Sequence, residues 1–372
     1  MINEKELERL NNLSRQLEEI YKHLRIEEYN APLNRDEERK KLYNSYSVEK
    51  PYNPQFTYRL VPEGMNKHLQ QFIRRIEPEK NIWEELLFKD AKQMLDTLET
   101  LVTHDPAQIT AFSIAADGLP TEKLVQEAYD EISKPKPSPE KETITAEEAS
   151  QIMREALDSI QLSDWEIIID DVMSASMMVR SVEKKVKIRK GKNFSPHAIK
   201  RLLVHEIGTH VFRYTNGAAQ KIHLLRLGLS GYMMTEEGMA TYHEEKYNLR
   251  DLVTARRYAL RVIAAHLSLT HSYFDVFALI AKHTDLDDAF DIVSRSKRGL
   301  TDTSEYGSHI KDKVYFEGFQ KVSLHLQKNP SDYAFLMGGK VSLDMLRLIK
   351  EANSANLFVL PRYLPELIKL PS

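Results

Sequence analysis

Two histidines five residues apart constrain the local fold of this chain more than any other feature. They lie in the stretch His205-Glu206-Ile207-Gly208-Thr209-His210. In a regular α-helix, five residues turn about 140° around the axis, so the two imidazoles would point apart. A π-bulge, which adds one residue to a helical turn and is frequent at functional sites, would bring both rings to one side. Gly208 lies inside the stretch and would ease the distortion. If the histidines share a metal ion, the helix must be bulged between Glu206 and His210.

The residue types around this stretch match a catalytic zinc site. Such a site uses three protein ligands and leaves a fourth position for water. The chain contains no cysteine, so histidine and carboxylate groups must hold any metal. A glutamate in the later segment Thr235-Glu236-Glu237-Gly238-Met239-Ala240 can supply the third ligand, and Glu206 can act as the base for the water. The alternative is that the histidine pair is incidental, because His-Glu-x-x-x-His also occurs in helices that bind no metal.

The composition excludes several classes of function. The 372 residues are 42% hydrophobic and 29% charged, which is ordinary for a soluble globular protein. A net charge of -3 gives no general attraction to nucleic acid. The N-terminus is polar and acidic, and no apolar run approaches membrane-spanning length. We therefore expect a cytoplasmic protein that binds neither nucleic acid nor membranes.

One stretch resembles a linker and divides the chain in two. It is Ser133-Lys134-Pro135-Lys136-Pro137-Ser138-Pro139-Glu140-Lys141, rich in proline and lysine. Before it, we expect a helical N-terminal region, residues 1–133, in which residues 30–64 form an extended segment rich in proline and tyrosine. After it, we expect a catalytic region, residues 143–372.

The patterns in the second region predict an α+β fold. Three short segments rich in β-branched or alternating residues indicate strands at 165–170, 177–182 and 185–189. The histidine helix then begins at Ser195-Pro196, and a second helix carrying the acidic pair begins at Thr235. We expect a predominantly helical protein with a small, mostly antiparallel sheet preceding a zinc-binding helix. This order is typical of peptide-cleaving zinc enzymes with a gluzincin-like core, in which an edge strand can hold an extended substrate.

The same residues carry a family resemblance. The segments 205–213 and 235–240, together with Asn216-Gly217, resemble the tyrosine carboxypeptidase family typified by the microtubule-associated tubulin enzyme. Its bacterial members are often labelled flavohemoglobin-expression-modulating QEGLA-motif proteins. Here the QEGLA motif reads Glu236-Glu237-Gly238-Met239-Ala240. Further similarity at 52–56, 311–318 and 339–341 extends the resemblance over most of the chain.

The resemblance selects the third metal ligand. The Glu-Gly-x-Ala part of the family motif is retained here, which assigns the ligand role to Glu237 rather than Glu236. Dipeptidyl peptidases with a His-Glu-x-x-Gly-His motif share the five-residue histidine spacing, and the second glutamate of their Glu-Glu pair binds zinc. That second resemblance is limited to the site, and it also favours Glu237.

The resemblance further implies removal of a C-terminal residue, commonly tyrosine, from a peptide or protein. Such an enzyme must bind a free carboxylate, for which arginine and lysine are the natural partners. Candidates are Arg180 on a predicted strand, Arg298, and Lys311 in a segment that shares the resemblance. Tyr315 is a candidate donor to the oxyanion that forms at the scissile carbonyl. The alternative for each is a solvated surface charge or a packed aromatic ring.

We therefore predict a zinc metallocarboxypeptidase. Zinc is held by His205, His210 and Glu237, and Glu206 removes a proton from the water that attacks the last peptide bond. Two alternatives stay open: a zinc endopeptidase or aminopeptidase, and a non-catalytic regulatory protein that keeps the same fold. The sequence does not indicate the oligomeric state.

Overall fold

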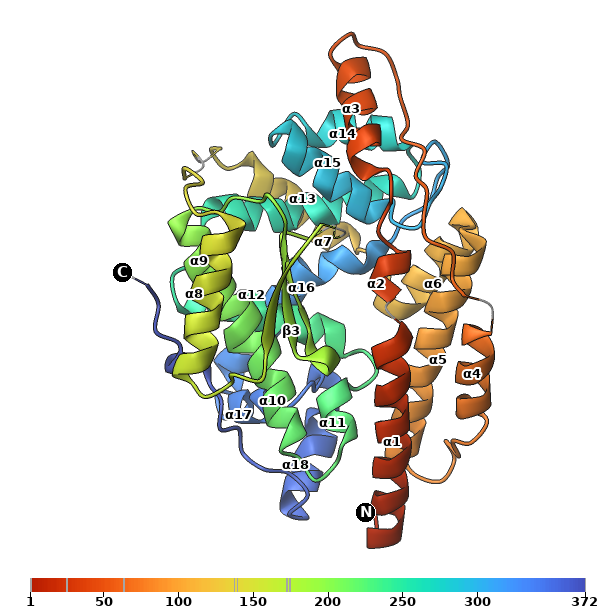
Figure 1. Cartoon of the computed structure of the whole chain (residues 1–372), viewed down its shortest axis with the longest axis vertical. Coiled ribbons are helices and arrows are strands. Elements are labelled where there is room, and N and C mark those ends of the chain that lie inside the picture. The colour runs from red at the N-terminus through yellow and green to blue at the C-terminus, as the bar shows by residue number, and fades with distance from the viewer. Residues whose placement is uncertain are drawn as a thin grey trace.

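Helices make up most of the structure, and a small sheet lies among them (Figure 1). The computed structural model describes residues 2–24, 26–62, 64–136, 138, 140–171, 173 and 175–371. A mostly helical chain with one small sheet is consistent with the predicted α+β class.

The elements follow one another along the chain in two groups. The first comprises α1 (Glu4–Leu24), α2 (Ile26–Tyr29), α3 (Arg35–Tyr46), α4 (Met65–Ile73), α5 (Ile82–Thr103), α6 (Pro106–Asp117) and α7 (Glu122–Ser133). The second begins with α8 (Ala146–Ser159), β1 (Glu166–Asp170), β2 (Met177–Arg180), η1 (Ser181–Glu183), β3 (Lys185–Arg189), α9 (Pro196–Leu202), η2 (Leu203–Val211), α10 (Phe212–Ala218), α11 (Leu224–Leu227) and α12 (Tyr232–Lys246). It continues with α13 (Leu252–Ser268), α14 (Tyr273–Ile280), α15 (Leu286–Ser296), η3 (Ile310–Lys313), α16 (Val314–Lys328), α17 (Asp332–Met337), η4 (Leu343–Met345), α18 (Leu346–Ser354) and η5 (Pro365–Leu367).

Local sequence signals fix several helix starts. Thr145 and Glu148 form a reciprocal capping box at the start of α8, in which each side chain accepts from the other residue's backbone N–H. Ser195 caps α9 by accepting a hydrogen bond from the backbone N–H of Ala198, and Pro196 occupies the first helical position. The histidine helix therefore begins where the sequence predicted.

The sheet is mixed rather than mostly antiparallel. Its strand order is β1-β3-β2, with β1 parallel and β2 antiparallel to the central strand β3. The chain leaves β1, runs to the far edge to form β2, and returns between the two as β3, which imposes one parallel pair. Val186 and Ile188 of β3 are fully buried, whereas the alternating Lys185, Lys187 and Arg189 are only partly buried. This alternation gives β3 one apolar and one cationic face.

The segment predicted to be extended contains a helix, α3. Its sequence is highly charged, and Leu42 is its one buried apolar residue among those described, so helical periodicity gave no signal there. Polar contacts stabilise it instead. The buried carboxylate of Glu38 accepts hydrogen bonds from the hydroxyl of Tyr52 at 2.6 Å and from the backbone N–H of Gln55 at 2.7 Å. The residues after α3 are irregular up to α4, as expected.

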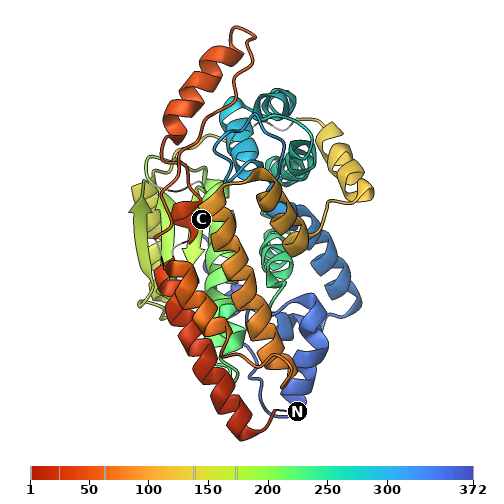
Figure 2. The ribbon, with the colours of Figure 1, turned by 90° about the vertical axis from the view of Figure 1, so that its right-hand side faces the viewer.

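The N-terminal helices stand against the rest of the molecule. In two perpendicular views, α1, α4, α5 and α6 lie together along one side (Figures 1 and 2). Two apolar clusters each combine residues from before and after the linker: one contains Leu17 and Leu203, the other Val125 and Phe277. The domain boundary expected at residues 133–143 therefore stays a prediction. Both apolar clusters pack residues from the two sides of that boundary together.

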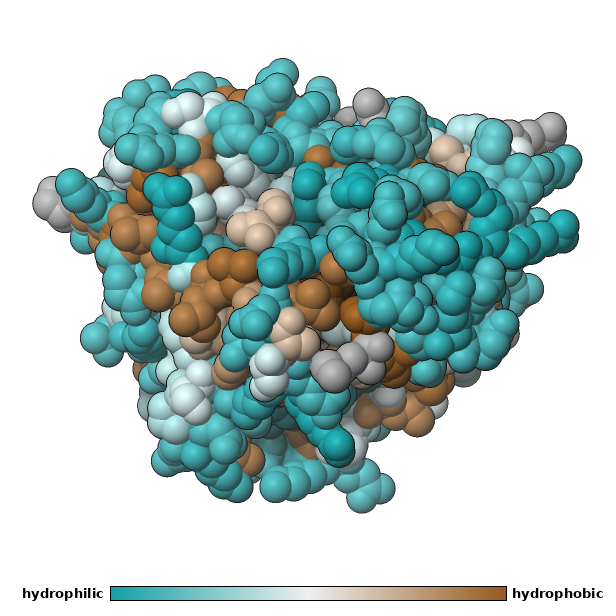
Figure 3. Space-filling model, turned by 90° about the horizontal axis from the view of Figure 1, so that it is seen from below, coloured by the Kyte–Doolittle hydropathy of each residue, from teal (hydrophilic) through white to brown (hydrophobic). Residues whose placement is uncertain are grey.

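Within the described ranges, no helix combines the length and the hydropathy needed to cross a bilayer. The face at the bottom of Figure 1 is a mosaic in which hydrophobic side chains lie between hydrophilic ones (Figure 3). Scattered exposed apolar residues of this kind are normal on protein surfaces.

Candidate metal centre

The two histidines lie on a π-helix. Element η2, Leu203–Val211, has π-helical hydrogen bonding throughout and continues from α9 into α10. A π-helix bonds residue i to residue i+5, so residues five apart fall on one side. The ring centroids of His205 and His210 are accordingly 5.0 Å apart. The predicted distortion between Glu206 and His210 is confirmed.

Glycine serves a second purpose in this helix. A Cβ atom added at Gly208 would lie 3.0 Å from the side chain of Ile368 and 3.4 Å from that of Pro365. The C-terminal segment therefore packs directly on the π-helix, and the absence of a side chain at position 208 permits that close approach.

Helix α12 brings Glu237 to the histidines. The helix begins at Tyr232, after Gly231 in a left-handed conformation, so Thr235 is not its cap as the sequence suggested. The hydroxyl of Thr235 instead accepts a hydrogen bond from the backbone N–H of Leu343. Glu237 Oε2 lies 3.6 Å from Nε2 of His205 and 3.7 Å from Nε2 of His210.

These three side chains fit a zinc ion. Their ligand atoms all lie within 4.8 Å of one another, and they are the one such group found among the described residues. Two ligands held 2.0–2.1 Å from a tetrahedral zinc are about 3.4 Å apart, close to the distances seen here. Glu237 Oε2 is also buried without any hydrogen-bond partner. An orphaned carboxylate oxygen facing two imidazole nitrogens is the arrangement that a bound cation would satisfy.

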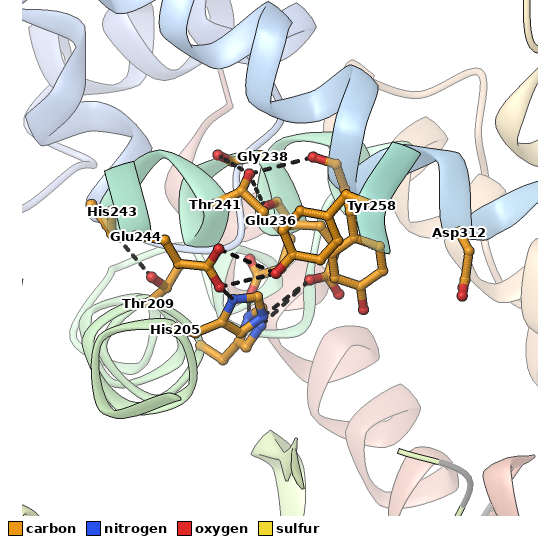
Figure 4. A network of polar contacts seen from close by, with 12 residues as sticks. His205, Thr209, Glu236, Gly238, Thr241, His243, Glu244, Tyr258 and Asp312 are labelled. Atoms are coloured by element: carbon orange, nitrogen blue, oxygen red, sulfur yellow. Dashed lines mark hydrogen bonds and ion pairs between the residues drawn. The ribbon is translucent and has the colours of Figure 1, made fainter. Parts of the chain in front are cut away.

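A second carboxylate orients His205. Its Nδ1 donates to Oε1 of Glu244 at 2.8 Å (Figure 4). This leaves Nε2 of His205 facing Oε2 of Glu237. Glu244 is itself fully buried, and it accepts from Arg201 at 2.7 Å and from the hydroxyl of Tyr258 at 3.0 Å. Carboxylates in this position fix the tautomer and ring orientation of metal-binding histidines.

His210 has an equivalent partner. Its Nδ1 donates to Oε1 of Glu236 at 2.8 Å. The other oxygen of Glu236 pairs with Arg213, a fully buried arginine that also donates to the backbone carbonyls of Leu336 and Val341. The acidic pair of the motif is therefore divided: Glu237 faces the histidine Nε2 atoms and Glu236 supports a ring from behind.

The carboxylates give the centre a strongly negative field. Burial alone would lower the pKa of His205, but the surrounding carboxylates, Glu237 foremost, raise this pKa to about 10. Burial would likewise raise the pKa of Glu236 and Glu244, yet Arg213 and Arg201 respectively are the main partners that lower each to about 2. A site that attracts an extra proton so strongly also favours a metal cation.

The centre lies where two cavities meet. The Lys311 cavity, about 520 Å³, is bordered by β2, α12, η3 and the N-terminal helices. The Arg257 cavity, about 880 Å³, is bordered by α3, α13 and α15 and by the loops at the end of the sheet. His205, Glu206 and Tyr315 line both cavities. An extended polymer bound at the centre can therefore continue into both cavities.

All the residues singled out from the sequence line the Lys311 cavity. They are His205, His210, Glu237, Glu206, Tyr315, Arg180, Arg298 and Lys311. Glu206 is 5% exposed, and its carboxylate makes no hydrogen bond to any residue that the structure describes. Tyr315 stacks on His205, with centroids 6.4 Å apart. Burial and the carboxylate of Glu237 raise the pKa of the Tyr315 phenol, so its proton is retained.

The three predicted cationic residues differ in their partners. Arg180 pairs with Glu183. Arg298 and Lys311 make no ion pair or hydrogen bond with any residue in the described part of the chain. Burial, and then the positive charge of Arg295, lower the pKa of Arg298. These two cations are thus available to an anion in the cavity.

Sequence reasoning missed the supporting residues. Glu244 lies seven residues after Glu237, hence on the same face of a helix, and that spacing was a usable signal. Arg201 gave no comparable signal, and Arg213 only its place at the end of the resemblance segment 205–213, because the pairing of both with carboxylates is created by tertiary packing. Lys340 also lines the Lys311 cavity, where its ammonium donates to the hydroxyl of Ser181 at 3.0 Å. Lys340 lies in the segment 339–341, which shares the family resemblance, but the sequence assigned no role to it.

Comparison with known proteins gives a consistent result. The family model described as microtubule-associated tyrosine carboxypeptidase matches residues 46–372. Microtubule-associated tyrosine carboxypeptidase 1 of Homo sapiens is 35% identical over 149 residues, which are 38% of this chain and 31% of that protein. Its Mus musculus counterpart is 30% identical over 172 residues, 45% of this chain and 36% of that protein. The putative tyrosine carboxypeptidase MATCAP2 of Mus musculus is 30% identical over 174 residues, 45% and 33% of the two chains. The chain therefore spans about a third of the length of the curated relatives it matches.

Proposed function

This chain belongs to the family of microtubule-associated tyrosine carboxypeptidases, and we propose that it is a zinc-dependent carboxypeptidase. It removes the C-terminal residue, by preference tyrosine, from a peptide or protein. One observation carries the proposal: a π-helix and α12 direct two imidazoles and a carboxylate oxygen without a hydrogen-bond partner towards one point. Beside them lie two cations, Arg298 and Lys311, that pair with no residue the structure describes.

His205, His210 and Glu237 are the residues that would hold zinc. When bound, zinc supplies Lewis acidity towards the scissile carbonyl and acidifies water. The chain's own contribution is to fix the ligands. Glu244 and Glu236 hold the two rings in the tautomer that presents Nε2.

Glu206 carries the proton in this proposal. Its carboxylate is buried at the junction of the two cavities and is not engaged by another described residue. One of its oxygens accepts a proton from the attacking water and then delivers that proton to the nitrogen of the leaving amino acid. Glu206 thereby returns to the ionised form at the end of each cycle.

Tyr315 stabilises charge at the carbonyl oxygen. Its phenol retains its proton and lies beside His205. A hydrogen bond from this hydroxyl to the carbonyl oxygen becomes stronger as negative charge develops there, which lowers the barrier.

Arg298 and Lys311 select a substrate with a free C-terminus. Two cations that pair with no described residue, in a partly buried cavity, would bind a carboxylate, and arginine can do so through two parallel hydrogen bonds. The terminal residue therefore occupies the Lys311 cavity, and the preceding residues leave through the Arg257 cavity. Arg180 takes a secondary place because Glu183 already neutralises it.

The experiment that tests this function compares peptides with free and amidated C-termini. Zinc-loaded protein is incubated with a peptide set of varied terminal residues, and products are identified by mass. We expect loss of one C-terminal residue from free peptides, most rapidly tyrosine, and no reaction of the amidated forms. Glu206→Gln should bind zinc and lose turnover by at least about a hundredfold.

Other outcomes identify the alternatives. Internal cleavage of the amidated peptides would indicate an endopeptidase, and release of the first residue an aminopeptidase. Zinc content that stays far below one ion per chain after reloading, with no cleavage of any peptide, would favour a non-catalytic regulatory protein. Cytoplasmic location and the absence of nucleic-acid or membrane partners stay predictions from the sequence.

A further inference from the structure

The N-terminal helices form one wall of the Lys311 cavity. Side chains from the end of α1, from α5 and from α6 line it, together with the segment between α1 and α3. The wall is apolar at Leu24, Ile26 and Phe112 and polar at Gln93 and Asp117. Apolar sides with a few polar groups are the usual composition of a pocket that reads a small ligand or side chain.

Asp117 is the unusual member of this wall. It is half-buried, and its carboxylate makes no hydrogen bond or ion pair with any residue that the structure describes. Burial raises its pKa, and the positive charges of Lys311 and Lys313 oppose that rise. Asp117 is also the last residue of α6, where the helix dipole disfavours a negative charge. Neither its burial nor its position stabilises the fold, so a structural role does not account for it.

Lys311 lies close enough to both Asp117 and the metal centre to act on each electrostatically. Its charge acts on the carboxylate of Asp117 and also on that of Glu237. All three side chains line the same cavity. A terminal residue whose carboxylate binds Lys311 thus has its own side chain within the part of the cavity that includes the N-terminal wall.

We propose that Asp117 accepts a hydrogen bond from the phenol of a C-terminal tyrosine and so distinguishes tyrosine from phenylalanine. The inference rests on the proposed carboxypeptidase function. Leu24, Ile26 and Phe112 suit an aromatic ring, and Lys311 and Lys313 disfavour a second cation beside Asp117, which excludes lysine or arginine as the preferred terminal side chain. The chain itself shows this pairing elsewhere: Tyr43 donates to Asp287 at 2.8 Å.

The consequence is a specific kind of selectivity. A site built to accept a hydrogen bond from a hydroxyl rejects the analogue that lacks it, because the buried acceptor is then left unpaired. A purely apolar pocket would instead accept phenylalanine at least as well as tyrosine. Asp117 therefore acts as a specificity-determining residue.

The test uses two peptides that are identical except for a terminal tyrosine or phenylalanine. For the parent protein we expect kcat/KM to favour tyrosine by about tenfold to a hundredfold. Asp117→Asn replaces the charged acceptor with a neutral one, so it should lower the tyrosine value by about fivefold to tenfold and leave the phenylalanine value within about twofold. Glu99→Gln, a matched change at an exposed position of α5, should alter neither value. The melting temperature of Asp117→Asn should equal or exceed that of the parent, because an unfavourable buried charge is removed.

Two results would overturn the inference while the proposed function stands. One is an equal loss for both peptides in Asp117→Asn, which would make Asp117 a support for Lys311 or for the fold. The other is no change in kcat/KM for either peptide in Asp117→Asn. If the parent releases neither residue, the proposed function fails, and the wall is tested by calorimetric binding of the two peptides to the Glu206→Gln protein. Equal affinity there would refute the role of Asp117, and tighter binding of the tyrosine peptide that Asp117→Asn weakens would support it.

Discussion

Nδ1 of His205 and a carboxylate oxygen of Glu244 lie 2.8 Å apart, although 39 residues separate them in the sequence. Glu244 is fully buried and also accepts from Arg201. The pair joins the π-helix to α12 directly behind the proposed ligand atoms, so the position of His205 depends on a residue outside any recognisable motif.

We expect Glu244→Gln to weaken zinc binding by about tenfold to a hundredfold, because the ring loses a charged acceptor and Arg201 loses its counter-ion. Competition with a chelator of known affinity measures the effect, and circular dichroism at the same temperature shows whether the variant is folded. Glu245→Gln, one residue further along α12 and exposed, is the matched control. An unchanged zinc affinity in folded Glu244→Gln would show that this carboxylate does not support the site.

The close contact between Gly238 and Gly318 sets the second prediction. A Cβ atom at Gly238 would lie 2.5 Å from the backbone oxygen of Gly318, so α12 and α16 touch through their backbones. Glu237 and Tyr315 lie beside this contact on the two helices. Gly238→Ala must force the helices apart, and we expect a loss of about 1–3 kcal/mol in the free energy of unfolding together with weaker zinc binding.

Chemical denaturation with and without zinc measures both effects of Gly238→Ala. Glu245→Ala adds no atoms at a helix contact and provides the comparison on the same helix. Stability and zinc affinity equal to those of the parent would mean that the two helices can separate without disturbing Glu237.

The histidine spacing was enough to predict that a shared metal requires a π-bulge, because the five-residue interval between His205 and His210 fixes which helix geometry can place both rings together. The capping residue Ser195 likewise acts through a near neighbour, and its helix begins where predicted. Local physical rules were enough for these features. The third proposed ligand, Glu237, came from the family resemblance.

Other features depend on contacts between distant parts of the chain. The parallel pairing of β1 with β3 follows from the path of a connection, which strand patterns do not reveal. Helix α3 has almost no apolar periodicity and is stabilised by Glu38, a carboxylate satisfied from residues 52 and 55. The pairing of Glu236 with Arg213 is equally non-local. Only the structure shows that Arg180 already pairs with Glu183, whereas Arg298 and Lys311 pair with no described residue and are available to a substrate carboxylate.

That availability leads to a prediction about binding. Arg298→Gln and Lys311→Gln should each lower kcat/KM for peptides with a free C-terminus by about tenfold or more, mainly through a higher KM, since a charged hydrogen bond to the substrate is lost. Steady-state kinetics measure the two constants separately. Arg74→Gln, an exposed arginine after α4, should have no effect. A fall in kcat alone would instead assign these cations to the chemical step.

A buried acid near the Lys311 cavity makes stability depend on pH. Asp90 on α5 is 6% exposed and accepts a hydrogen bond from the hydroxyl of Tyr21 at 3.3 Å. Burial raises its pKa to about 7, against the opposing effects of Tyr21 and Lys340. In the unfolded chain an aspartate has a pKa of about 3.9.

The sign of the effect follows from these two values. Below about pH 4 the carboxyl is protonated in both states, so its contribution to stability is fully present. Between about pH 4 and pH 7 the unfolded chain ionises while the folded protein does not, and the folded state loses up to about 4 kcal/mol relative to the unfolded one. Above pH 7 both are ionised and the loss is constant.

Asp90→Asn removes this titration and keeps an acceptor for Tyr21. We therefore expect the difference in unfolding free energy between variant and parent to grow in favour of the variant from pH 4 to pH 7, and then to level off. Urea denaturation at a series of pH values measures it, and Asp96→Asn on the same helix controls for the loss of an acidic group. The test is how this free-energy difference changes with pH, because the substitution itself adds an offset that does not depend on pH. A difference that does not change with pH would mean that Asp90 is ionised in the folded protein throughout, and that Lys340 compensates its burial more fully than the surrounding structure indicates.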